Sequence, residues 1–290
     1  MTLLRGHENA TDTLREWRES APHWAKHSAT IRTLFAPLTQ AIIEDADIGP
    51  GQSVLDVAGG AGEPSLTIAR VVGLAGSVMC TDAVAEMVAT AEGAAQRQGI
   101  RNVRFRQCTA DSLPFEDNSF DTVVSRLGAM FFPDPLLSIR GMLRVARPGG
   151  TISLAVWHKS ELNPFLYCIT DVMNRYIETP PSDPDAPGAF RFAEPGKLAG
   201  VFTDAGASDV TERLFKFRME APMSAQEYWI LRSEISETLR ANIARLNAEQ
   251  TFGVRMEVQE AVREFFPNGE MSFPAQMLIV TATKRDDAEI

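Results

Sequence analysis

Short apolar runs alternate with longer amphipathic stretches between residues 50 and 157. The short runs are typical of buried strands, and apolar residues spaced three and four positions apart indicate helices. This alternation predicts an α/β fold, with a parallel sheet covered by helices on both faces. We expect strands over residues 52–57, 77–81, 103–107, 121–125 and 150–156, and helices over residues 64–73, 84–98 and 135–146.

The chain is mainly helical on either side of this region. Ahead of it, the pattern predicts a helix near residues 11–20, a break that begins at Pro22, and a second helix from Ile31 to Ile43. The roughly 50 residues between the last two expected strands exceed what a hairpin needs, so they predict a helical lid. After residue 157 we expect helices from Asn163 and over residues 195–205, 224–248 and 254–266, and strands over residues 210–219 and 273–284.

A glycine-rich turn follows the first expected strand, which ends in Asp56. Strand, tight turn and helix form the first unit of a doubly wound fold, and glycines let a ligand approach the backbone. A dinucleotide fingerprint needs a third glycine where Ser65 stands. Glu63, in the first helical turn, would also repel a phosphate, although simple capping of the helix by Glu63 stays an alternative.

Polar residues follow four of the expected strands. Asp56, Asp82, Asp111 and Arg126 all stand at or just after a strand end. The carboxyl ends of parallel strands meet at one edge of the sheet, which is where ligands bind in such folds. Asp82 is placed to hold a ribose diol, so the pattern indicates an adenosine-type ligand without a pyrophosphate. For each acid, a role in a turn or cap stays open.

Four stretches together resemble the class I S-adenosylmethionine-dependent methyltransferases. They are Asp56–Gly62, Asp82–Met87, Ala110–Asp121 and Leu143–Ile152, which occur in order and at fitting spacing. The resemblance covers roughly residues 50–157 and is closest to the small-molecule group that includes ubiquinone and menaquinone methyltransferases. The chain departs from the family pattern at Ala58, where a glycine is often found.

The resemblance implies a Rossmann-like, seven-stranded, mostly parallel sheet with helices on both faces. We expect three regions. Residues 1–48 form an N-terminal helical cap, residues 49–157 form the S-adenosylmethionine-binding core, and residues 158–290 complete the sheet and carry a substrate-binding helical lid.

The resemblance also implies the residues that bind the cofactor. Asp56 would lie near the methionine ammonium, Asp82 would take the ribose hydroxyls, and Asp111 would accept from the adenine amino group. Arg126 would pair with a carboxylate of cofactor or acceptor, or simply bridge loops. An acidic pocket suits S-adenosylmethionine, whose net charge is positive. The other expected cofactor contacts are Ala58, Gly60, Gly62, Ala83, Met87, Ala110 and Ser112.

Several residues are candidates for the acceptor side of the site. The apolar stretch Leu127–Pro135 follows the fourth strand and would form either an acceptor wall or helix packing. The loop over residues 179–188 would lead Phe190–Phe192 back to the site. His158 ends the fifth strand and is the expected general base if the acceptor must lose a proton, with His27 as second candidate. A structural role for either histidine stays open.

Composition limits the remaining possibilities. The net charge of −10 argues against a nucleic-acid partner. No residues have metal-ligand spacing, and the three cysteines are interpreted as small buried hydrophobes. Without a signal peptide or an apolar run long enough to span a membrane, we expect a soluble cytoplasmic protein, and a homodimer stays open.

The first hypothesis is therefore in-line methyl transfer from S-adenosylmethionine to a small, largely apolar or aromatic acceptor. A non-catalytic S-adenosylmethionine-binding regulatory protein is an alternative, because a fold does not fix a function. An NAD-dependent oxidoreductase is a weaker alternative, since Ser65 and Glu63 disfavour it.

Overall fold

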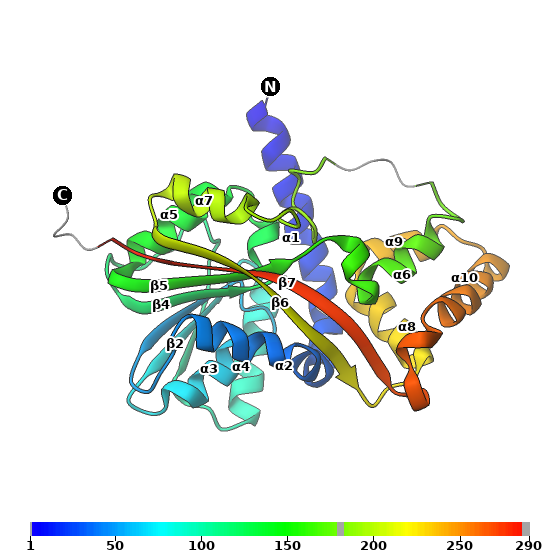
Figure 1. The fold of residues 1–290 in the computed structure, drawn as a ribbon, viewed down its shortest axis with the longest axis horizontal. Helices are drawn as coiled ribbons and strands as arrows, with labels where there is room; N and C mark the ends of the chain where they lie inside the picture. Colours follow the sequence, from blue (N-terminus) through cyan, green and yellow to red (C-terminus); the bar gives the residue numbers. More distant parts are fainter. Residues whose placement is uncertain (1, 179–182, 286–290) are drawn as a thin grey trace.

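A seven-stranded sheet forms the centre of the molecule (Figure 1). The computed structural model describes residues 2–178 and 183–285, with side-chain surroundings from residue 13 onward, so part of the expected loop over 179–188 lies outside the description. The strand order is β3-β2-β1-β4-β5-β7-β6. The strands are β1 (Ser53–Val57), β2 (Ser77–Asp82), β3 (Val103–Gln107), β4 (Phe120–Arg126), β5 (Ala146–Trp157), β6 (Ser208–Ala221) and β7 (Met271–Thr283).

The strand pairings confirm the expected mostly parallel sheet. β7 pairs antiparallel with β5 and β6, while β3, β2, β1, β4 and β5 are parallel neighbours. The central strands have buried side chains on both faces, including Val54, Leu55, Val123 and Leu154, as a parallel sheet requires. The order reverses between β1 and β4, so the crevice at their carboxyl ends is open to a ligand.

Helices cover both faces of the sheet (Figure 1). Helices connect β1 to β2, β2 to β3 and β4 to β5, and each of them packs an apolar stripe on the sheet. Asp134 caps α5 by accepting from the Leu137 amide, as its position before Pro135 indicates. The helices on one face are α2 (Ser28–Asp45), α3 (Ser65–Val72) and α4 (Ala85–Arg97), and those on the other are α5 (Pro135–Val145) and α7 (Lys197–Ala205).

The N-terminal segment departs from the expected break. α1 (Thr2–Lys26) continues through Pro22, and the turn comes at His27. A proline removes one helical hydrogen bond, but packing on both sides of it can keep a helix continuous. Ser20 and Ala21 are buried just before Pro22, and Trp24 just after it lies 5.6 Å from Trp17, ring centroid to centroid.

The helical lid lies beside the long antiparallel strand pair β6–β7 (Figure 1). Ser236 divides the expected 224–248 helix in two, because its hydroxyl caps the second half by accepting from the Leu239 amide. Asn247 and Gln250 form a capping box that starts the last helix earlier than expected. The lid helices are α6 (Pro164–Met173), α8 (Ala225–Ile235), α9 (Glu237–Ala244) and α10 (Ala248–Ala261).

An aromatic cluster joins the lid to the sheet. Phe273 of β7 lies 5.7 Å from Phe165, 5.0 Å from Tyr228 and 4.7 Å from Phe265, between ring centroids. The Tyr228 hydroxyl also donates to the Phe165 carbonyl at 2.8 Å. The lid therefore packs on β7 through these aromatic side chains. No helix in the described ranges has the length and apolar character of a membrane span.

Candidate functional site

The glycine-rich turn after β1 has an unusual backbone. Ala58, Gly60 and Gly62 have φ angles of 59°, 55° and 111°. Such angles cost glycine little, whereas an alanine in the left-handed region is strained. The turn is fixed from outside by the Gly60 amide, which donates to Asp82 Oδ2 at 3.0 Å. The backbone is thereby exposed to whatever occupies the crevice.

Asp56 lies beneath this turn rather than in the crevice. Its side chain is wholly buried, and Oδ2 accepts from the Ser65 amide at 3.1 Å and the Ser65 hydroxyl at 2.5 Å. A Cβ on Gly59 would lie 2.8 Å from the same oxygen, so this position has no room for a side chain. Asp56 Oδ1 is enclosed without a hydrogen-bond partner, and burial raises the pKa of Asp56 to about 7. Asp56 therefore fastens α3 to β1.

A cavity of about 180 Å³ opens beside the turn, at the carboxyl ends of the strands. Asp82 projects into it with a fixed carboxylate, which accepts from the amides of Val84 and Gly60. Burial raises the pKa of Asp82. Seven of the expected cofactor contacts line this cavity: Ala58, Gly60, Asp82, Ala83, Met87, Ala110 and Arg126.

Four expected cofactor contacts do not line the cavity. Asp56 and Gly62 shape the turn from behind, and a Cβ on Gly62 would lie 3.3 Å from the Ala91 backbone. The loop after β3 presents Ala110 to the cavity, but not Asp111 or Ser112. The geometry therefore supports no direct contact by these four residues.

Glu63 and Arg126 place opposite charges on the cavity wall. Glu63 Oε2 accepts from Thr67 at 2.7 Å, but Oε1 is enclosed without a hydrogen-bond partner. Arg126 donates to Thr39 at 2.7 Å and to the Glu63 carbonyl at 3.1 Å, so it bridges α2 and the turn. Burial lowers the pKa of Arg126, and the charge of Glu63 partly offsets this effect. The sequence predicted an acid, Glu63, at the N-terminus of the helix after β1. It did not show that one oxygen of this carboxylate lacks a hydrogen-bond partner.

A second cavity, of about 290 Å³, adjoins the first. Trp17 lines both cavities, and its ring lies 5.6 Å from that of Trp24 and 5.1 Å from that of Phe131, between centroids. Arg232, Glu16 and Glu237 are the charged residues among its lining. The residues that line both cavities are Thr13, Trp17, Trp24, Ile31, Phe35, Leu127 and Phe131.

The apolar stretch after β4 contributes to this second cavity. Leu127, Met130 and Phe131 line it, which favours the acceptor-wall interpretation. The returning loop reaches the cavity through residues 187–189, where the Gly188 amide donates to the Met130 carbonyl at 3.1 Å. Phe190–Phe192 was expected there, but these residues do not line either cavity.

The two candidate histidines lie away from the cavity walls. His158 is buried, and its Nδ1 hydrogen-bonds the Ala193 carbonyl at 2.7 Å. Neither His158 nor His27 lines either cavity. The structure therefore gives no support to His158 as a general base. Among described residues, no group of three His, Cys, Asp or Glu side chains is placed to hold a metal ion.

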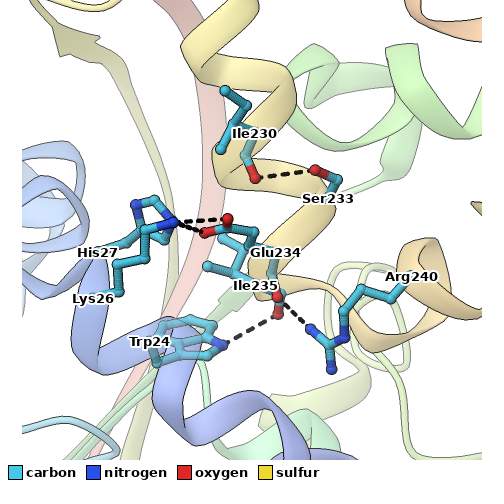
Figure 2. Close-up of polar contacts among 8 residues, drawn as sticks. All are labelled: Trp24, Lys26, His27, Ile230, Ser233, Glu234, Ile235 and Arg240. Carbon is cyan, nitrogen blue, oxygen red and sulfur yellow. Dashed lines mark hydrogen bonds and ion pairs between the residues drawn. The ribbon is translucent and has the colours of Figure 1, made fainter. Parts of the chain in front are cut away.

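A polar clasp joins the N-terminal cap to the lid (Figure 2). Glu234 of α8 accepts from Lys26 at 2.7 Å and lies 2.6 Å from His27 Nε2. The Trp24 indole donates to the Ile235 carbonyl at 3.2 Å, and Arg240 bonds the Glu234 carbonyl. Glu234 and Arg240 thus do not form a merely solvated helix face, because both pair across elements.

Residues 36–171 match the ubiE/COQ5 methyltransferase family. This part of the chain is therefore similar to class I methyltransferases. A ubiquinone/menaquinone biosynthesis C-methyltransferase, UbiE, of Cellvibrio japonicus is 38% identical over 118 residues, 40% of this chain and 47% of that protein. The uncharacterized protein Rv1405c of Mycobacterium tuberculosis is 40% identical over 124 residues, 43% of this chain and 44% of that protein.

These matches are confined to part of each relative. The chain spans about half the length of the curated relatives that it matches at this identity. A longer match, to the uncharacterized protein Rv1403c of Mycobacterium tuberculosis, is 28% identical over 268 residues, 90% of this chain and 92% of that protein. Rv1403c therefore also has counterparts of most of the chain outside residues 36–171.

Solved structures agree with the class I fold. YcgJ of Bacillus subtilis has a TM-score of 0.55 at 21% identity, covering 86% of this chain and 98% of that one. The [4+2]-cyclase SpnF has a TM-score of 0.52 at 18% identity, covering 92% and 95%. At such identities the likeness concerns the fold alone. SpnF is named as a cyclase, so the class I fold does not by itself fix the reaction.

Proposed function

We propose that the protein transfers a methyl group from S-adenosylmethionine to a small, largely apolar or aromatic acceptor. The observation that carries this proposal is the pair of adjoining cavities at the carboxyl ends of the strands, which share an aromatic wall. One cavity would hold the cofactor and the other the acceptor.

The residues of the first cavity fit S-adenosylmethionine. Asp82 offers a fixed carboxylate to the ribose hydroxyls, and Glu63 offers an unpartnered oxygen to the methionine ammonium. Arg126 is the cation on this wall and suits the methionine carboxylate. Met87 and Ala110 supply apolar surface for adenine. Two acids and one base also match the net positive charge of the cofactor.

When bound, the cofactor supplies an activated sulfonium methyl. The chain's own task is then to hold the acceptor nucleophile in line with that methyl and to exclude water. Positioning of this kind can supply roughly 7–11 kcal/mol of the barrier reduction. The aromatic wall that the two cavities share consists of Trp17, Trp24 and Phe131, and it would fix the approach of the acceptor. Because no described histidine lines either cavity, we assign no general base.

The three expected regions acquire roles in this proposal. The second cavity is lined by Trp17 and Trp24 of the cap, by Leu127 of the core, and by Arg232 and Ile235 of the lid. Cap, core and lid would therefore enclose the acceptor jointly. The family match ends at residue 171, before α8, α9 and α10 of the lid begin.

The first prediction concerns Asp82. We expect Asp82→Ala to weaken binding of S-adenosylhomocysteine, the demethylated product, by about tenfold or more, because charge-assisted hydrogen bonds are lost. Isothermal titration calorimetry measures this effect. Asp111→Ala is the matched control, since Asp111 does not line the cavity and its removal is expected to leave the affinity nearly unchanged. Equal weakening by both variants would contradict the assignment of the ribose site.

A further inference from the structure

Arg232 is a partly buried cation on the wall of the second cavity. It projects from α8, and its guanidinium carbon lies 5.1 Å from the centre of the Phe165 ring. Its Nε is buried and has no hydrogen-bond partner. Burial lowers the pKa of Arg232, and the Tyr228 hydroxyl offsets this only in part.

No carboxylate neutralises Arg232 within the described part of the chain. Other arginines do form ion pairs, such as Arg144 with Asp117 and Arg213 with Asp45. Glu237 lines the same cavity, but among the described contacts it forms no ion pair with Arg232. Arginine does not escape burial by losing its proton, so an enclosed guanidinium without a counterion is costly.

We propose that the acceptor carries a carboxylate, which Arg232 binds inside this mostly apolar cavity. This proposal rests on the proposed function, because it assigns the second cavity to the acceptor. Contact with Phe165 orients the guanidinium plane, and a planar fork is suited to a two-point contact with a carboxylate.

The chemistry of the cavity also favours a carboxylate over a dianionic phosphate. Arg232 is the cation among the lining residues, and two carboxylates, Glu16 and Glu237, share the same wall. The one guanidinium of Arg232 can pair with one carboxylate, whereas a dianionic phosphate would place a further negative charge near the two acids. With the aromatic wall, the inferred acceptor class is a compact aromatic or apolar acid.

Small probes test this inference on the full chain without any cofactor. Benzoate, benzamide, benzylamine and phenyl phosphate share one ring and differ in charge. We expect benzoate to bind about tenfold or more tightly than benzamide, and Arg232→Met to abolish that preference. Arg255→Met is the matched control, because Arg255 also has an enclosed, unpartnered Nε but lies outside both cavities. Arg232→Gln serves if the methionine variant does not fold.

Each outcome decides the proposal. Preference for benzoate that Arg232→Met removes and Arg255→Met retains supports it. Equal binding of acid and amide, no binding of benzoate, tighter binding of benzylamine or phenyl phosphate, or retained preference in Arg232→Met overturns it. Titration with S-adenosylhomocysteine is run separately, so failure of the methyltransferase proposal is distinguishable from failure of the carboxylate site.

Discussion

The direction of the Asp56 side chain decides whether its carboxylate can contact a ligand in the cavity. The sequence predicted an acid at the end of β1, and the structure has one there, but its carboxylate binds Ser65 behind the turn. The Asp56 carboxylate points this way because it binds the amide and hydroxyl of Ser65 at the start of α3. The sequence pattern does not show where Ser65 lies in space. Glu63 instead supplies the carboxylate on the cavity wall.

The pKa of Asp56 leads to the second prediction. Its folded-state value is about 7 against an ordinary value of 3.8. Between these values the folded chain keeps a proton that the unfolded chain releases, so stability falls as the pH rises through this window and then levels off. We expect Asp56→Asn to gain about 2 kcal/mol relative to wild type between about pH 5.5 and about pH 8.

Urea unfolding at both pH values measures this difference. Asparagine can still accept from Ser65, so the turn should persist in the variant. Asp111→Asn serves as the control carboxylate outside the cavity, and we expect it to lack this pH-dependent gain. A constant offset between Asp56→Asn and wild type at the two pH values would refute the burial argument.

At the scale of elements, strands and capped helices were predictable and tertiary pairings were not. All seven strands were expected near their observed positions, because strands have either short apolar runs or alternating apolar residues. Pro22 was expected to end a helix, but packing by Trp17 and Trp24 outweighs that local signal. The pairing of Glu234 with Lys26 joins segments far apart in the chain, and no local pattern marks it.

That clasp gives the third prediction. We expect Glu234→Gln to change global stability by less than about 1 kcal/mol, because ion pairs near the surface contribute little. It should nevertheless speed amide hydrogen exchange in α8 and in the C-terminal part of α1, which the clasp fastens together (Figure 2). Glu260→Gln removes an exposed pair with Arg263 elsewhere in the lid and is the control. Equal exchange in both variants would show that the clasp does not hold the lid.

The clasp also has an expected pH dependence. Lys26 and His27 lower the pKa of Glu234. A lowered carboxyl pKa means that the stabilisation is present above the ordinary value and is lost as the pH falls through the lowered one. We therefore expect the α8 exchange protection to be retained at neutral pH and to decrease only in acid.

On the scale of the whole molecule, the sheet and the cofactor edge were predictable, but the second cavity was not. Asp82, Met87 and Arg126 could be placed because parallel strands end at one edge. Arg232 could not, because its helix reaches the cavity only through the packing of the lid on β7. The position of His158 at the end of β5 was predictable, but the hydrogen bond of its ring with the Ala193 carbonyl was not. A homodimer stays a prediction.

The central claim is that the cavity beside the glycine-rich turn binds S-adenosylmethionine. Calorimetric titration of the full chain with S-adenosylmethionine, S-adenosylhomocysteine and NAD tests it most directly. We predict saturable binding of the first two and none of NAD, because Glu63 on the cavity wall would repel a pyrophosphate. Binding of NAD without binding of either adenosyl compound would contradict the account.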